Sequence, residues 1–112
     1  MKPTIITNAT ILRLRDRIEE KYPELLERFE RGAMLAMLRK IIDCGNLQFE
    51  VESSDRKKFY TVSYAKPKSC TCEDFVYNNP SHGFCKHLLA VSIYLQAVKE
   101  KEMSKDLVEV PV

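Results

Sequence analysis

Cys70-Thr71-Cys72 and, after a spacer, Cys85-Lys86-His87 decide how the second half of this chain folds. Together they supply three thiolates and one imidazole in two short pairs. Soft sulfur donors combined with one imidazole favour zinc, which accepts such a set of four ligands as a closed structural site. We therefore predict that Zn2+ is bound by Cys70, Cys72, Cys85 and His87.

Disulfides and ordinary buried thiols are the alternative interpretations of these cysteines. Disulfides in a small framework require an oxidising compartment, and residues 1–8 are too polar, with too short an apolar part, for a secretory signal. We therefore expect a reducing, intracellular location, either cytoplasmic or nuclear. Cys44 has no ligand-type neighbour close in sequence, so we expect an ordinary buried thiol there.

The two pairs of ligands require different backbone settings. In a strand, residues two apart face the same way, so Cys70 and Cys72 can bind one ion if the backbone bends. On a helix, residues two apart diverge by about 200°. We therefore predict that Cys85 lies just before a helix and His87 lies in its first turn. His82 is the alternative nitrogen ligand, but its serine and glycine neighbours indicate a flexible turn in which an exposed histidine is the default.

Composition limits the size of the fold and the evidence for partners. The chain has 112 residues, enough for one domain with a modest core. Its formal net charge is +2, from 18 basic and 16 acidic residues, so only a local patch of charge could favour nucleic acid. No apolar run approaches the roughly 18 residues of a membrane span, and we expect no membrane association.

Helical periodicity dominates the first half of the chain. Residues 9–21 place apolar side chains three and four apart among charged ones, and residues 23–43 predict a second helix that begins at a proline. We expect residues 33–42 to be buried, because apolar side chains occur there on more than one face. Gly32 indicates close packing in the helix interior. Residues 44–46 are typical of a left-handed cap at a helix end.

The period then changes from helical to alternating. Residues 47–52 and 60–64 alternate apolar and polar side chains, which predicts an antiparallel hairpin with one apolar face. A third helix is predicted from Lys86 to about Glu102, and residues 107–110 could add a short strand. The predicted fold is therefore α+β: an N-terminal helical hairpin, a β-hairpin and a zinc-stapled strand-strand-helix module. The predicted parts are a helical region (1–44), a zinc-binding module (45–102) and a tail (103–112).

The metal pattern and its flanks resemble the SWIM zinc finger, over roughly residues 45–98. SWIM modules carry a Tyr-x-Val strand before the first cysteine, as in Tyr60-Thr61-Val62, and an acidic-aromatic step after the second, as in Asp74-Phe75. Glu73 stands where many SWIM sequences have proline, which leaves the ligands unchanged. The resemblance implies a strand-strand-helix zinc fold found in transposase-related proteins, chromatin remodellers and recombination mediators. It implies binding to DNA or to proteins and does not select between them.

Two functions remain open from the sequence. The first is a DNA-associated protein, in recombination, transposition or transcription, with Tyr60 and Tyr64 available for stacking if they are exposed. Its phosphate contacts would come from basic residues around the finger, although such residues often only solvate a surface: Arg56, Lys57, Lys58, Lys66, Lys68 and Lys86. The second is a protein-interaction adaptor or homodimer in which zinc only stabilises the fold. A zinc hydrolase ranks third, because four protein ligands leave no position for water, and we expect no enzymatic activity.

Overall fold

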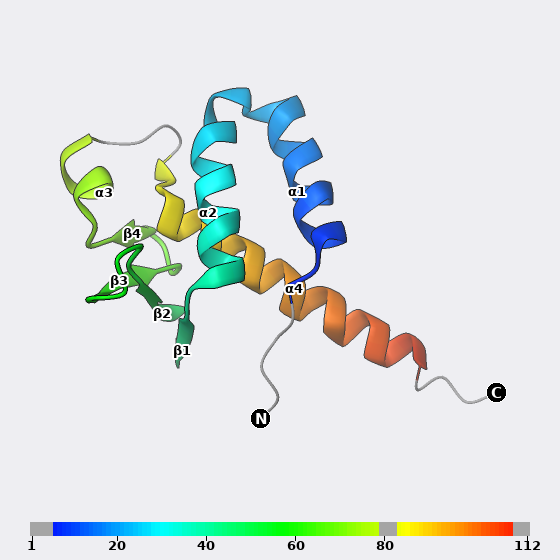
Figure 1. Ribbon diagram of the computed structural model, residues 1–112. Coiled ribbons are helices and arrows are strands. Elements are labelled where there is room, and N and C mark those ends of the chain that lie inside the picture. Colours follow the sequence, from blue (N-terminus) through cyan, green and yellow to red (C-terminus); the bar gives the residue numbers. More distant parts are fainter. Residues whose placement is uncertain (1–5, 79–82, 109–112) are drawn as a thin grey trace.

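The computed structural model describes residues 6–78 and 83–108, and it combines helices with one antiparallel sheet (Figure 1). The helices are α1 (Asn8–Lys21), the 3-10 helix η1 (Pro23–Leu25), α2 (Leu26–Leu38), α3 (Glu73–Asn78) and α4 (Lys86–Val108). The strands are β1 (Ile41–Gly45), β2 (Gln48–Glu52), β3 (Phe59–Ser63) and β4 (Ser69–Cys70). This order of helices, strands and helix confirms the predicted α+β class.

The N-terminal helices begin close to the positions that the sequence predicts. The Thr7 side chain accepts a hydrogen bond from the Thr10 amide at 3.2 Å and caps α1. Pro23 then starts η1, a position at which proline is favoured because its missing N–H has no helical partner. These observations confirm the first two predicted helix starts. The end of the second helix differs, because α2 stops at Leu38.

Strand β1 occupies the end of the segment that we predicted as helix. Ile41 and Ile42 are β-branched residues, which favour strands, and they pair with Val51 and Glu50 of β2. Residues 45–47 all have positive φ values, of 86°, 56° and 60°. The left-handed backbone that we predicted after the helix therefore forms, but it closes the β1–β2 hairpin and caps no helix.

The sheet has the strand order β1-β2-β3-β4, and the predicted hairpin forms its centre. Phe49 and Val51 of β2 and Val62 of β3 are fully buried on the face that packs against α4. Leu47, which we had assigned to the same apolar face, lies in the β1–β2 turn and is exposed. The alternating pattern thus identified β2, β3 and their buried face, except at this first position.

Helix α4 runs between the sheet and the helices α1 and α2 (Figure 1). Leu88 and Val91 pack on the sheet side, whereas Leu89 and Ile93 pack on the opposite side with Phe29 of α2. Both faces of its first half are therefore buried. None of the described helices, α4 included, combines the length and apolar character that a membrane crossing requires.

The C-terminal end of the fold differs from prediction. The helix α4 continues to Val108, so residues 107 and 108 belong to a helix and form no strand. Residues 109 and 110, the rest of the predicted tail strand, lie outside the described residues. The local sequence after residue 102 has no break such as proline or glycine before Pro111, and this is consistent with continued helix.

Gly32 marks the closest approach of α2 to α4. A Cβ atom at this position would lie 2.8 Å from the carbonyl oxygen of Lys86 and 2.9 Å from the Cβ of Leu89. Contacts this short do not occur between real Cβ atoms and their neighbours. The close packing that we inferred from this glycine is confirmed, and its partner is the first turn of α4.

The burial that we expected over residues 33–42 holds for only one side of α2. Leu35 is buried, but the side chains of Met34, Met37 and Leu38 are exposed. Cys44 is likewise exposed at the end of β1, which corrects our expectation of a buried thiol. The apolar pattern was misleading because α2 packs on α4 and α1 with one face only, leaving an apolar surface uncovered among the described residues.

Candidate metal centre

The four predicted ligands converge from three segments of the chain. Cys70 ends β4, Cys72 precedes α3, and Cys85 and His87 flank the first residue of α4. Their ligand atoms all lie within 4.8 Å of one another, and all four residues are buried. We call this set the Cys/His cluster.

Helix starts position two of the thiols. The Cys85 carbonyl accepts a hydrogen bond from the Leu89 amide at 3.0 Å, so Cys85 stands immediately before α4, and His87 lies in its first turn. Both placements confirm the predicted arrangement. At the start of α3, the Cys72 carbonyl accepts from Val76 at 3.0 Å and its Sγ accepts from the Phe75 amide at 3.4 Å. The positive end of each helix therefore lies beside a thiol, which favours the thiolate that a metal requires.

The geometry and donor types of the cluster fit zinc. A tetrahedral ion with Zn–S bonds of about 2.3 Å holds its sulfurs roughly 3.8 Å apart. This distance is compatible with ligand atoms that all lie within 4.8 Å of one another. Both ring nitrogens of His87 are buried and have no hydrogen-bond partner among the described residues. Buried polar atoms are rarely left without a partner, and a bond to a metal would satisfy one of them. The competing residue, His82, lies outside the described residues.

The short distances between the buried thiols also shift their pKa values. Hydrogen bonding from Cys70 and Cys85 lowers the pKa of Cys72 below its ordinary value. The same contact with Cys72, together with burial, raises the pKa of Cys70. Without a cation, the negative charge of one thiolate thus keeps its neighbour protonated. A divalent ion removes this restriction and lets all three thiols act as thiolate ligands.

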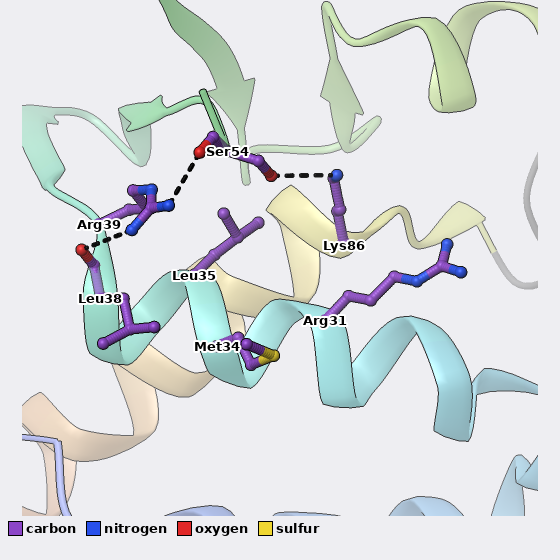
Figure 2. Close-up of a pocket in the computed structure, with 7 residues that line it drawn as sticks. All are labelled: Arg31, Met34, Leu35, Leu38, Arg39, Ser54 and Lys86. Carbon is purple, nitrogen blue, oxygen red and sulfur yellow. Dashed lines mark hydrogen bonds between the residues drawn. The ribbon is translucent and has the colours of Figure 1, made fainter. Parts of the chain in front are cut away.

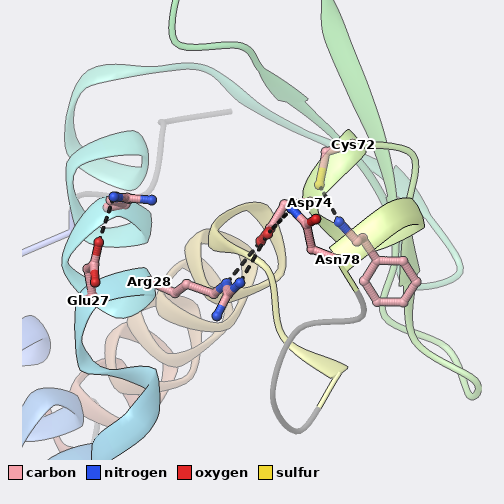
Figure 3. A network of polar contacts seen from close by, with 7 residues as sticks. Glu27, Arg28, Cys72, Asp74 and Asn78 are labelled. Atoms are coloured by element: carbon pink, nitrogen blue, oxygen red, sulfur yellow. Dashed lines mark hydrogen bonds and ion pairs between the residues drawn. The ribbon is translucent and has the colours of Figure 1, made fainter.

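An ion pair beside the Cys/His cluster connects α3, which follows Cys72, to α2. The Arg28 guanidinium donates from Nε and Nη2 to the two carboxylate oxygens of Asp74, at 2.9 and 3.0 Å (Figure 3). Asp74 lies in the first turn of α3. The pKa of Asp74 lies below its ordinary value, chiefly because of the hydrogen bonds from Arg28. Sequence reasoning missed Arg28, because nothing in its local pattern distinguishes it from Arg31, the other arginine of α2.

The six predicted phosphate-binding residues fall into two groups. Arg56, Lys57 and Lys58 are exposed on the β2–β3 turn, and the Nζ of Lys86 approaches Ser54 of the same turn at 3.4 Å. We call these four residues the turn cations. Lys66 and Lys68 follow the opposite end of β3, before β4. The structure therefore does not bring all six together.

The two tyrosines that we considered for base stacking are half-buried. The Tyr60 ring packs against His87 with 4.5 Å between ring centroids, and the Tyr64 hydroxyl is 2.6 Å from the Ser92 hydroxyl of α4. Both rings thus contribute to the packing around the cluster and the sheet.

Comparison with known proteins places a family match on the part of the chain that carries the cluster. No curated protein and no solved structure matches the chain significantly. Residues 60–96 match the SWIM zinc finger family, and this segment includes β4, α3, the start of α4 and all four members of the Cys/His cluster. Together with four buried residues positioned to bind a metal such as zinc, this match shows that residues 60–96 form a SWIM zinc finger.

Proposed function

We propose that this chain is a DNA-associated protein in which zinc has a structural role and the turn cations contact phosphates. The observation that carries the proposal is the convergence of Arg56, Lys57 and Lys58 with Lys86 from a different element. Among the described residues, none of these four forms an ion pair with a carboxylate. Asp55, the acid within the turn, is engaged locally by the Lys57 amide and the Ser53 hydroxyl. Unpaired exposed cations are the groups that release counterions on binding DNA.

The position of Lys86 connects this proposed function to the metal. Lys86 lies between Cys85 and His87, so a metal bound by these two residues would fix the Lys86 backbone beside the β2–β3 turn. Zinc would thereby hold the turn cations from two elements in one arrangement. Because four protein ligands leave no coordination position for a reacting water, we propose a non-enzymatic role for this site.

Lys66 and Lys68 would provide a second, separate contact. They lie beyond β3, a strand of five residues that spans roughly 16 Å at the usual rise per residue. The Nζ of Lys68 lies over the rings of Tyr64 and Phe84, at 4.7 and 5.2 Å from the centroids, an arrangement that orients the ammonium group. We expect these two lysines to add salt-dependent affinity for DNA. Their contribution should change little when Lys86 is replaced, because they lie at the other end of β3.

Titration of a fluorescently labelled short DNA duplex, followed by anisotropy at two salt concentrations, tests this function. We expect binding at low salt that weakens as salt rises, and we expect Lys57→Glu to weaken it about tenfold and to reduce the salt dependence. Lys99→Glu is the matched control, because Lys99 is exposed on α4 away from the turn. The proposal fails if the duplex does not bind at low salt, if binding is independent of salt, or if both variants lose affinity equally.

Protein interaction is the second candidate function, and a specific surface favours it. Met34, Met37 and Leu38 of α2 and Ile42 of β1 are exposed large apolar side chains close together in sequence. Met34 and Leu38 also line one groove, and contiguous exposed apolar surface marks interaction sites more often than single exposed residues do. Light scattering separates a second copy from a different partner, because a homodimer would double the measured mass.

A further inference from the structure

A groove of about 300 Å³ lies along α2, beside the start of α4 and the β2–β3 turn (Figure 2). Its floor is apolar and consists of Met34, Leu35 and Leu38. Its rim carries the basic side chains of Arg31, Arg39 and Lys86, and Ser54 lies between the last two. We call this site the α2 groove.

The floor of the α2 groove has accessible apolar area. The Met34 and Leu38 side chains are 62% and 58% exposed, whereas Leu35 between them is buried. Residues four apart on a helix share one face, so Met34 and Leu38 line one stripe of α2 that faces solvent, and Leu35 lies buried beside them. Methionine adapts its shape to different apolar partners, and this suits the floor to an inserted side chain.

Three basic side chains form the rim of the α2 groove, and two of them form no ion pair with a carboxylate of the described residues. Arg39 donates to the backbone carbonyls of Leu38 and Ser54, at 3.2 and 2.8 Å, and Lys86 is near the Ser54 hydroxyl. Neither forms an ion pair within the described part of the chain, and the Nε of Arg39 is buried without a hydrogen bond. Only Arg31 is paired, with Glu27 at 2.6 Å.

We propose that the α2 groove binds an acidic amphipathic segment of a protein partner. One or more bulky apolar side chains of that segment would cover Met34, Leu35 and Leu38, and its carboxylates would meet Arg39 and Lys86. Amphipathic helices bind in this way by placing an apolar face in a groove. The inference deepens the second candidate function and rests on it. A nucleic acid fits the rim but not the floor, which offers methionine and leucine where base stacking requires aromatic rings.

The test uses a fluorescein-labelled helical peptide with leucines on one face and glutamates on the other. We expect saturable binding by anisotropy that weakens as salt rises, and no binding of the same peptide with lysine in place of glutamate. Leu38→Glu should weaken binding at least tenfold, because it places a like charge on the apolar floor. Leu12→Glu is the matched control, since Leu12 on α1 is also 58% exposed but lies outside the groove. Zinc content and near-UV circular dichroism establish that each variant is folded, and Met34→Ser replaces Leu38→Glu if the latter is not.

Several results would overturn this proposal. Three results would each exclude an acidic partner from the α2 groove. The acidic peptide could fail to bind, or the lysine peptide could bind equally well. The third is that Leu38→Glu and Leu12→Glu bind the acidic peptide with the same affinity. A DNA duplex that loses affinity in Met34→Ser, which changes the floor without changing any charge near Lys86, would assign the groove to nucleic acid. A dimer by light scattering without peptide binding would overturn the groove proposal while leaving protein interaction intact, with a second copy as the partner.

Discussion

The two sides of α4 are stabilised by different chemistry (Figure 1). On the sheet side, three thiols of the Cys/His cluster belong to the same buried cluster as Phe49, Val51 and Val62. On the helical side, Phe29 of α2 meets Leu89 and Ile93 of α4, and no metal ligand takes part. One helix therefore connects a layer that contains the candidate metal ligands to a layer stabilised by ordinary packing.

This difference leads us to expect that the folding of the sheet side depends on the metal. Its strands have between two and five residues, and α3 has six residues with no buried side chain. Short elements of this kind bury little apolar area for the entropy lost on ordering them. Structural zinc supplies on the order of 10 kcal/mol of apparent binding free energy, comparable to the total stability of a small domain.

The largest expected effect is loss of the metal. Replacing Cys85, which links the cluster to α4, by serine removes one thiolate, so we expect stoichiometric zinc to be lost and the unfolding free energy to fall by several kcal/mol. Metal analysis of the purified protein measures the first effect, and amide hydrogen exchange measures the second separately for each side of α4. We expect protection to be lost over β2, β3 and β4 before it is lost over α1 and α2.

Cys44→Ser provides the matched control for Cys85→Ser. Cys44 is exposed and is not part of the cluster, so this variant should retain both its zinc and its stability. If Cys85→Ser keeps one zinc per chain, the cluster is not the metal site. If instead the helices lose protection together with the sheet, the two sides form one cooperative unit and the contrast between them is only structural.

The next largest effect concerns the packed contact between the two layers. Gly32→Ala places a Cβ atom 2.8 Å from the backbone of Lys86, so α2 and α4 must separate. We expect a destabilisation of about 1 to 3 kcal/mol, as for other overpacked sites, although alanine is a better helix former than glycine by about 1 kcal/mol. Urea denaturation of the zinc-bound protein measures the change. Met37→Ala, at an exposed position of the same helix, should be nearly neutral, and an equally neutral Gly32→Ala would contradict the close contact.

The sequence predicted the metal side of this comparison better than the helical side. Ligand spacing is a local constraint: residues two apart can share an ion only if a strand bends or a helix begins between them. This argument correctly placed Cys85 before α4 and His87 in its first turn. The family match at residues 60–96 rests on the same local features.

The errors arose where distant contacts decide the outcome. Ile41 and Ile42 fit a helix or a strand by pattern, and pairing with β2 selects the strand. The exposure of Met34 and Leu38 depends on what covers α2, and no local pattern contains that information. The first half of α4 has two covered faces, and a helix that is apolar on more than one face has no single stripe from which its packing partners could be predicted.

A smaller effect is expected from the ion pair that joins α2 to α3. Arg28 and Asp74 form two parallel hydrogen bonds and are each less than one-third exposed. Arg28→Ala should therefore cost about 1 to 2 kcal/mol, more than a typical surface pair. A double-mutant cycle with Asp74→Asn isolates the coupling between the two side chains. Arg31→Ala is the control, because its pair with Glu27 on the same helix is largely exposed; equal losses for the two arginine variants would show that Arg28 has no special role beside the cluster.

The smallest expected effect lies on the helical side, where Glu100 of α4 accepts hydrogen bonds from Arg13 and Thr10 of α1. These contacts lower the pKa of Glu100 from 4.5 to about 2, with the Arg13 hydrogen bond as the main cause. Because the folded pKa is below the unfolded value, the stabilisation is complete above about pH 5 and is lost as the pH falls toward 2. Glu100→Gln should therefore lower the free energy of unfolding by about 1 kcal/mol near pH 7, a value that allows for solvent screening around the exposed Arg13.

Denaturation at several pH values from about 6 to 8 should give the same loss of unfolding free energy in Glu100→Gln, whereas zinc content should stay unchanged. A deficit that varies over this range, or a loss of zinc, would mean that Glu100 acts on the metal side and would break the distinction between the two sides of α4.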